Sequence, residues 1–345
     1  QDVSVSVGGE LERYYIEDYF SDADEFSPLK GAIDEAIRTA HADPYDAASL
    51  QVLASETSID LATLFFVSSI YADPDNRIMQ NRFEAKFQQL CQQIPFSSRD
   101  SADSSYTIAF VPGYGYAMDQ STGSDFARQR ELLRERGFDV RLIETDEVGT
   151  VEANARLITE ALTEMDSGPN GVVVVSTSKG GPEVALALGD PSNHEVLGKV
   201  RAWISVGGIL RGSPYADHLG RHPLRWFITT IGAMLGHRRG ILENLSTEVR
   251  GPVMDGLILP PDLLVLHYVG APLENQIERS NRGRYDALKD LGPNDGLTLL
   301  ADEILPDGIV ITDIGLDHYF RHPQIDLITL ALTQIVLEEL ELTRI

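Results

Sequence analysis

The stretch GVVVVSTSKGG at residues 171–181 decides the fold of this chain. Its four consecutive valines predict a strand that is buried on both faces of a sheet. The strand ends in a turn of small residues, and an apolar, alanine-rich helix follows at once. A strand that passes directly into a helix through Ser-x-Ser-x-Gly lifts the hydroxyl of Ser178 above the edge of the sheet. This is the geometry of a nucleophile elbow.

Small residues flank Ser178 at the two positions where such an elbow needs them. Strand and helix nearly touch there, so the residues two before and two after the nucleophile must be small. Ser176 and Gly180 meet this need, although Ser176 stands where the usual Gly-x-Ser-x-Gly pattern has glycine. From this segment alone, Ser178 is either a nucleophile or a serine that ends a core strand.

A serine hydroxyl needs an adjacent base, and in this arrangement the chain order is serine, acid, histidine. His318 lies in Gly-Leu-Asp-His-Tyr-Phe, just past the expected strand 308–314 and before the C-terminal helix. From such a loop it can reach back over the sheet, so it is the expected base. His322 is the second candidate, but a proline follows it and it is expected at a helix start. His267 interrupts a strand pattern and is expected to be a core histidine.

The acid is expected in the loop after the penultimate strand, 262–270, where Gly-Pro-Asn-Asp-Gly-Leu-Thr contains Asp295. An Asp-Gly turn is expected to expose the carboxylate and to leave room for a histidine. Asp295 would then accept the proton on the imidazole nitrogen that faces away from the serine. The alternative is that Asp295 only forms the turn. Other acids remain open for the role: Asp302, Glu303, Asp313 and Asp317.

Residues 107–116, TIAFVPGYGY, predict an apolar strand that runs into a glycine-rich loop. Acyl transfer builds negative charge on a carbonyl oxygen, and two backbone N–H groups can stabilise it. The expected donors are Lys179, which follows the nucleophile, and Tyr114 in this loop. The alternative is a phosphate loop, but the segment lacks the Walker lysine and the Gly-x-Gly-x-x-Gly spacing, so nucleotide binding is not expected.

Together these segments resemble the α/β-hydrolase superfamily over roughly residues 105–345, and the Asp-Gly-Leu and Asp-His segments are most similar to those of bacterial lipases and esterases. The resemblance implies a mostly parallel sheet with helices on both faces. It also implies that Ser178 attacks an ester carbonyl, assisted by His318 and Asp295, and that water releases the acyl-enzyme. The matching segments are 112–115, 176–181, 294–297 and 317–318.

The order of elements supports the same fold. Apolar strands alternate with helices from residue 107 on, which predicts a parallel sheet covered on both faces, with the site at the carboxyl ends of the strands. The expected strands are 108–111, 139–144, 172–176, 202–206, 263–269 and 309–313, and the expected helices lie near 125–136, 151–164, 181–188 and 324–340.

Residues 1–104 predict a helical N-terminal extension that packs on a catalytic domain of residues 105–345. Apolar residues recur at helical spacing, after a short strand-like start at 3–7 and before a polar linker at 97–105. The expected helices are 29–40, 47–56, 59–71 and 77–94.

An insertion at about 212–261 interrupts the strand–helix alternation, and related enzymes place a cap or lid there. Its middle is apolar and aromatic. Trp226 and Phe227, with Tyr116 of the glycine-rich loop, are the expected substrate-binding residues. Trp226 and Phe227 either shield an acyl chain from water or fill the core of the cap itself. A basic cluster either binds an anionic substrate group or pairs with nearby acids: Arg211, Arg221, Arg225, Arg238 and Arg239.

The composition of the chain limits the classes of binding partner that are expected. The net charge is −25, from 28 basic and 53 acidic residues, so neither nucleic acid nor an anionic membrane surface is expected to bind. Hydrophobic residues make up 43% of the chain, which is ordinary for a globular protein. The single cysteine, Cys91, forms no intrachain disulfide, and no Cys/His cluster has zinc spacing. The sequence therefore predicts no metal and no cofactor, and a small-molecule or lipid-like ester as substrate.

The apolar stretch 61–72 is too short to span a bilayer, so no stable membrane insertion is expected. The chain begins at Gln1. It is either cytoplasmic or, if Gln1 follows a removed signal peptide, periplasmic or secreted. Two other functions remain open: an acyltransferase or thioesterase with the same three side chains, and a binding protein without catalytic activity on this fold. The sequence leaves the oligomeric state open.

Overall fold

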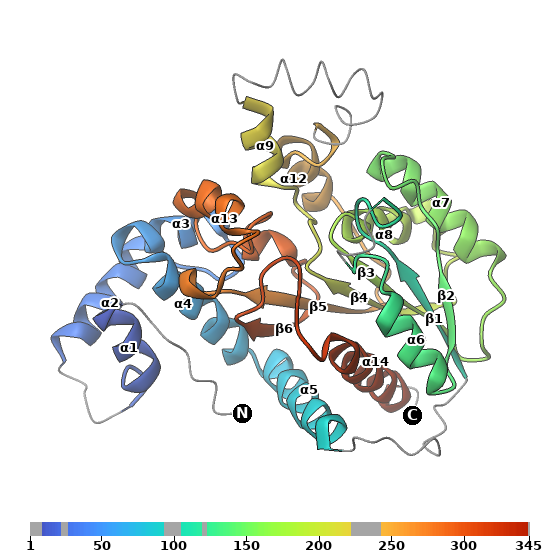
Figure 1. The fold of residues 1–345 in the computed structure, drawn as a ribbon, viewed down its shortest axis with the longest axis horizontal. Helices are drawn as coiled ribbons and strands as arrows, with labels where there is room; N and C mark the ends of the chain where they lie inside the picture. Colours follow the sequence, from blue (N-terminus) through green and yellow to red (C-terminus); the bar gives the residue numbers. More distant parts are fainter. Residues whose placement is uncertain (1–8, 22–26, 93–104, 119–122, 222–242, 344–345) are drawn as a thin grey trace.

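The computed structural model describes residues 9–21, 27–92, 105–118, 123–221 and 243–343. One sheet of six parallel strands runs through the molecule in the order β2-β1-β3-β4-β5-β6 (Figure 1). The expected strands are all present, which confirms the parallel sheet. The strands are β1 (Tyr106–Val111), β2 (Asp139–Leu142), β3 (Gly171–Thr177), β4 (Val200–Val206), β5 (Leu264–Ala271) and β6 (Ile309–Ile314).

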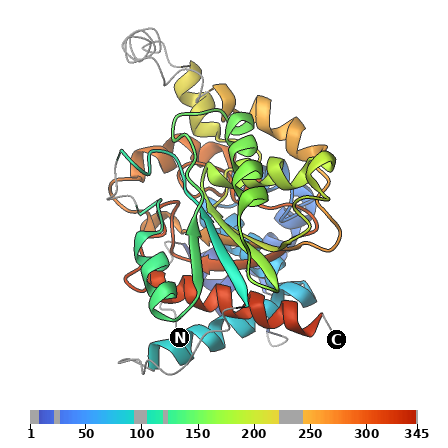
Figure 2. The ribbon, with the colours of Figure 1, turned by 90° about the vertical axis from the view of Figure 1, so that its right-hand side faces the viewer.

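Helices cover both faces of the sheet (Figures 1 and 2). Successive side chains of a strand point to opposite faces. Val173 and Val175 of β3 therefore pack in one core cluster, together with residues of α5 (Pro74–Gln92) and α14 (Ile325–Leu342). Val172 and Val174 pack in another, together with α7 (Val151–Glu164) and α8 (Gly180–Gly189). The run of four valines is apolar throughout because both faces of β3 are buried.

The strand order reverses at β1, which has β2 on one side and β3 on the other. In open parallel sheets, ligands bind beyond the carboxyl ends of the strands at such a reversal. The register brings the carboxyl ends of β1 and β3 together, because Val111 pairs with Ser176. The loop after β1 and the turn after β3 therefore lie side by side. Helix α6 (Ala127–Glu135) follows the loop after β1.

The N-terminal helices pack against the β5–β6 end of the sheet. Phe66 and Ile70 belong to the same core cluster as Val269 and Val310. The expected helices in this region are present: α2 (Pro28–Ala40), α3 (Ala47–Glu56), α4 (Ile59–Ala72) and α5, preceded by α1 (Glu10–Glu17). The strand-like start at 3–7 lies outside the described residues, and so does the boundary at residue 104, which stays a prediction.

The apolar stretch 61–72 belongs to helix α4, and its burial explains its composition. Leu61, Ala62 and Phe66 are fully buried. A short apolar run is typical of a core helix rather than a membrane span. Among the described residues, none of the helices has both the length and the apolar character that crossing a bilayer requires.

The insertion between β4 and β5 contributes two described helices, α9 (Pro214–Arg221) and α12 (Thr247–Asp255). Residues 222–242, and with them Trp226 and Phe227, lie outside the described part of the chain. Arg211 of the basic cluster forms an ion pair with Asp255. A further helix that the sequence pattern does not predict, α13 (Arg282–Leu288), lies between β5 and β6. The short 3-10 helices among the described residues are η3 (Pro191–Asn193), η4 (Glu274–Gln276), η5 (Lys289–Leu291) and η6 (Leu300–Glu303).

Candidate active site

The turn after β3 holds Ser178 in an unusual backbone conformation. Its φ is 52°, in the left-handed region that residues with a side chain rarely adopt. Hydrogen bonds on both sides hold it there, since the Ser178 amide donates to Val206 O at 3.3 Å and Ser178 O accepts from Gly181 and Ile209 at 3.0 and 3.1 Å. Strained residues of this kind cluster at functional sites.

The crowding around Ser178 explains the small residues on either side. A Cβ on Gly180 would lie 2.7 Å from Pro112 O, and one on Gly113 would lie 3.2 Å from Ser178 Cβ. The loop after β1 therefore touches the elbow. Ser176 has a role that glycine could not fill, because its Oγ accepts a hydrogen bond from Trp203 Nε1 at 2.8 Å in the core.

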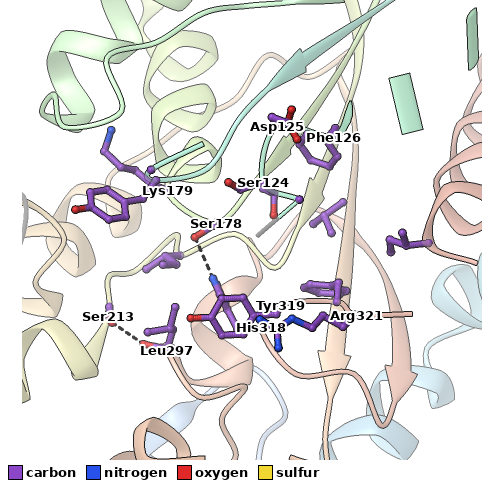
Figure 3. A pocket seen from close by; sticks show the side chains of 18 of the residues that line it. Ser124, Asp125, Phe126, Ser178, Lys179, Ser213, Leu297, His318, Tyr319 and Arg321 are labelled. Atoms are coloured by element: carbon purple, nitrogen blue, oxygen red, sulfur yellow. Dashed lines mark hydrogen bonds between the residues drawn. The ribbon is translucent and has the colours of Figure 1, made fainter. Parts of the chain in front are cut away.

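Three side chains distant in sequence meet at the carboxyl end of the sheet. His318 Nε2 lies 3.0 Å from Ser178 Oγ, and the two side chains point toward one another (Figure 3). His318 Nδ1 lies 2.5 Å from Asp295 Oδ2. The imidazole is thus hydrogen-bonded to a hydroxyl on one side and a carboxylate on the other. That arrangement can take a proton from the serine as it attacks a carbonyl.

The expectation that the Asp-Gly turn exposes the Asp295 carboxylate is wrong, because the residue is only 1% exposed. The turn folds back on the side chain instead. Asp295 Oδ1 accepts from the amides of Leu297 and Thr298 at 2.8 and 2.9 Å. These bonds compensate the burial of the carboxylate and leave Oδ2 facing the imidazole.

A buried asparagine joins the loop of Asp295 to the loop of His318. Asn281 Nδ2 donates to Asp295 O at 2.9 Å and to Asp317 Oδ2 at 3.1 Å. The backbone adds a direct bond, from the His318 amide to Asp295 O at 3.0 Å. Nothing in the sequence indicates this role, because Asn281 lies in the segment before α13 with no motif around it.

The other candidate acids have different surroundings. Asp313 accepts from the hydroxyl of Tyr268 at 2.6 Å, and Asp317 accepts from Asn281. Glu303 is buried beside Asp295. Burial first, and then the Asp295 carboxylate, raise the pKa of Glu303 well above its usual value, so the folded protein favours the protonated form of this carboxyl more than the unfolded chain does. Of the acids considered from the sequence, Asp295 is the one bonded to the His318 ring.

The side chain of Lys179, next to the nucleophile, is buried in an ion pair with Glu183. Asn154 Nδ2 also donates to this carboxylate, at 2.6 Å. Burial raises the pKa of Glu183 from 4.5 to about 7, against the opposing effect of the ammonium. The pair fixes the first turn of α8, which the backbone amide of Lys179 precedes.

The glycine-rich loop lies over the elbow and is fixed at both ends. The Gly113 amide donates to Ser124 O at 3.1 Å, and the amides of Ala117 and Met118 each donate to Glu147 at 3.0 Å. Tyr114 lines the cavity described below. Tyr116, expected to bind substrate, instead donates its hydroxyl to Thr145 O at 3.0 Å.

A cavity of about 1050 Å³ opens beside Ser178 and His318. Its volume is at the upper end of the range for small-molecule sites. Helix α9, a part of the insertion that the sequence pattern does not predict as a helix, contributes part of the cavity wall. The apolar lining includes Val206, Ile209, Ala216, Leu219, Leu245 and Leu297. Within the described ranges, no three His, Cys, Asp or Glu side chains are grouped so that they could hold a metal ion.

Comparison with known proteins identifies the fold. No protein-family model matches the chain, and no curated protein matches it in sequence. Solved structures do match. A carboxyl esterase from a metagenome is 20% identical with a TM-score of 0.56, and the match covers 69% of this chain and 77% of the esterase. The mature lipase BlEst2 of Bacillus licheniformis is 19% identical with a TM-score of 0.54, over 70% of this chain and 94% of the lipase.

The same lipase in its propeptide form gives a TM-score of 0.51 at 19% identity, over 67% of this chain and 52% of that one. These likenesses confirm the α/β-hydrolase fold that the sequence motifs predict. At such low identity, they establish the architecture, and the chemistry has to be argued from the site itself.

Proposed function

We propose that the protein is a serine hydrolase that cleaves carboxylic esters of hydrophobic acyl groups through an acyl-enzyme intermediate. The observation that carries the proposal is the hydrogen-bonded series Ser178–His318–Asp295 beside an apolar cavity. The solved structures of similar fold include proteins described as a carboxyl esterase and a lipase, which agrees with this reaction class.

In the first half-reaction, Ser178 Oγ attacks the ester carbonyl while His318 Nε2 accepts its proton. Asp295 holds the imidazole in the required tautomer and stabilises the imidazolium. The amides of Lys179 and Tyr114 are the proposed donors to the developing oxyanion, and losing one such donor typically costs about a hundredfold or more in rate. The imidazolium then protonates the leaving alcohol, and the acyl group stays on Ser178.

In the second half-reaction, water attacks the acyl-enzyme while His318 accepts a proton from it. The imidazolium then gives this proton to Ser178 Oγ, which leaves as the free hydroxyl as the carboxylic acid is released. The apolar lining holds the acyl chain away from bulk water. We infer that the insertion at 212–261 acts as a cap, because α9 supplies part of the cavity wall.

The test is hydrolysis of p-nitrophenyl esters from butyrate to decanoate by wild type and Ser178→Ala. We expect wild-type turnover and a loss of about a thousandfold or more in the variant. Ser205→Ala is the control substitution, since it removes the hydroxyl of a buried serine near the end of the neighbouring strand β4. Labelling with a fluorophosphonate should modify Ser178 in the wild type. Hydrolysis that survives Ser178→Ala would remove this residue from the mechanism, and labelling without hydrolysis would favour acyl transfer to another acceptor.

A further inference from the structure

The charge of the cavity lining is opposite to that of the whole chain. The chain has 28 basic and 53 acidic residues. Among the described residues that line the cavity, four are basic and one is acidic. The basic ones are Arg128, Lys179, Arg284 and Arg321, and the acidic one is Asp125. The cavity lining therefore carries more basic than acidic residues, although the chain as a whole is acidic.

Arg284 differs from the other basic residues of the lining. Arg128 pairs with Asp326 at 2.9 Å, Lys179 pairs with Glu183, and Arg321 pairs with Glu278. Within the described part of the chain, Arg284 has no carboxylate partner. Its guanidinium makes a single long hydrogen bond, 3.5 Å to Ser280 O.

Ring contacts place Arg284 close to the proposed base. Its guanidinium lies 5.6 Å from the centre of the Tyr319 ring, and that of Arg321 lies 4.8 Å from the same ring. Tyr319 in turn lies 6.0 Å from the His318 ring, measured between centres. Figure 3 shows Tyr319 and Arg321 beside His318. The unpaired cation and the proposed base thus both lie next to the Tyr319 ring.

We propose that Arg284 binds an anionic group of the substrate, so that the preferred esters carry a carboxylate or phosphate several bonds from the scissile carbonyl. This inference rests on the proposed ester hydrolysis. A guanidinium presents a planar fork of donors that matches both anions. Tyr319 holds the fork by a cation–π contact, and the half-buried setting strengthens the pairing relative to open water.

The first test compares two esters of equal chain length, p-nitrophenyl hexanoate and mono-p-nitrophenyl adipate, which differ in a terminal carboxylate. Wild type should have the higher kcat/KM for the adipate. Arg284→Gln should lower the adipate-to-hexanoate ratio by about tenfold or more, the size expected for a charge-assisted hydrogen bond. Arg284→Glu should lower it further. The control is Arg13→Gln, a substitution of an exposed arginine on α1, which should leave the ratio unchanged.

A second pair places the anion on the alcohol side: dihexanoyl phosphatidylglycerol against dihexanoylglycerol. If Arg284→Gln loses the wild-type preference for the charged ester in the first pair, Arg284 binds a carboxylate on the acyl side. If it loses that preference in the second pair, Arg284 binds a phosphate on the alcohol side. The proposal is overturned if wild type hydrolyses the neutral member of both pairs at least as well. It is also overturned if Arg284→Gln slows charged and neutral esters equally, which would mean a structural role.

A binding measurement separates this inference from the hydrolysis proposal. Calorimetric titration with hexyl phosphate or with hexanoate needs no turnover. Binding to wild type that weakens about tenfold or more in Arg284→Gln supports the anion site even if no ester is cleaved. Absence of binding of both hexyl phosphate and hexanoate to wild type refutes it. Hydrolysis that persists in Ser178→Ala counts against the proposed mechanism and leaves the Arg284 comparison intact.

Discussion

The side-chain amide of Asn281 donates to the backbone oxygen of Asp295 at 2.9 Å. The same nitrogen lies 3.1 Å from Asp317 Oδ2, next to the proposed base. One fully buried side chain thus joins the loop that carries the acid to the loop that carries the imidazole. Because hydrogen-bond geometry in such a site has to be held within a fraction of an ångström, this link has consequences for rate as well as for stability.

Asn281→Ala should therefore lower the free energy of unfolding by about 1–3 kcal/mol, since it removes two buried hydrogen bonds and leaves Asp317 Oδ2 without its amide donor. It should also lower kcat on a p-nitrophenyl ester by about tenfold or more, because Asp295 and His318 lose a shared anchor. The measurements are urea unfolding and steady-state kinetics at a temperature where the variant is folded.

Asn76→Ala is the matched control for Asn281→Ala. Asn76 is also buried and bonds two separate elements, donating to Ile70 O at 3.2 Å and accepting from Val310 N at 2.8 Å. It should destabilise the protein to a similar degree while kcat stays near the wild-type value. Equal losses of kcat in both variants would mean that Asn281 acts through general stability.

Ser176 and Ser205 offer a second matched comparison, because they pair with each other on β3 and β4 and are both buried. Ser176 Oγ accepts from Trp203 Nε1 at 2.8 Å, whereas Ser205 Oγ has no hydrogen-bond partner among the described residues. Ser176→Ala should lower the free energy of unfolding by about 1–3 kcal/mol, since it leaves a buried indole N–H unpaired.

Ser205→Ala should be neutral or stabilising, since it removes a buried hydroxyl that makes no bond. Urea unfolding of both variants measures the difference. If the two substitutions have the same effect, the bond to Trp203 does not explain why serine replaces the glycine of the usual elbow pattern.

The sequence predicts the parts of this site that follow from local pattern. Three of these parts lie in or directly after a strand that its apolar pattern identifies. They are the valine run, the elbow at Ser178 and the position of His318 after the last strand. The environment of Asp295 cannot be read in the same way. Its Asp-Gly turn is compatible with an exposed carboxylate. In the structure, the chain folds back so that the amides of Leu297 and Thr298 donate to Asp295 Oδ1, and the carboxylate is buried.

Contacts between segments far apart in sequence were not predictable either. Asn281 lies 36 residues from Asp317, and nothing in its neighbourhood distinguishes it from an ordinary loop asparagine. Arg284 belongs to α13, a helix of seven residues that is too short for a clear periodic pattern. Trp226, Phe227 and most of the basic cluster in the insertion lie outside the described residues, so their proposed roles stay predictions.

Glu303 gives a prediction for the dependence of stability on pH. Its pKa is raised above the usual value of 4.5 by burial and by Asp295, so the folded protein binds a proton there more tightly than the unfolded chain. This contribution to stability is fully present below about pH 4.5 and is lost as the pH rises toward the folded-state pKa.

Glu303→Gln replaces the carboxyl, whose pKa is raised in the folded protein, by an amide that cannot titrate. Relative to wild type, the variant should gain stability as the pH rises from 5 to 8, by at most about 1.4 kcal/mol per pH unit. Urea unfolding at each pH measures the difference between the two proteins. A difference that stays constant over this range would mean that Glu303 does not hold a proton in the folded state.

The buried pair of Lys179 and Glu183 should respond unequally to loss of either partner. The pKa of Glu183 is about 7 even with the ammonium beside it, so without Lys179 the carboxyl takes up a proton and stays buried as a neutral acid. Without Glu183, the ammonium keeps only a hydrogen bond to Asp146 O at 3.4 Å. Glu183→Leu should therefore cost about 3–5 kcal/mol of stability at pH 7, and Lys179→Met should cost less.

The double variant Lys179→Met/Glu183→Leu should be more stable than Glu183→Leu alone, because it leaves no charge without a partner and fills the site with apolar atoms. Urea unfolding of the four proteins gives the coupling free energy between the two side chains. If the changes in the free energy of unfolding are additive, the two side chains do not stabilise each other. Equal losses of stability in the two single variants would likewise contradict the view that each partner compensates the burial of the other.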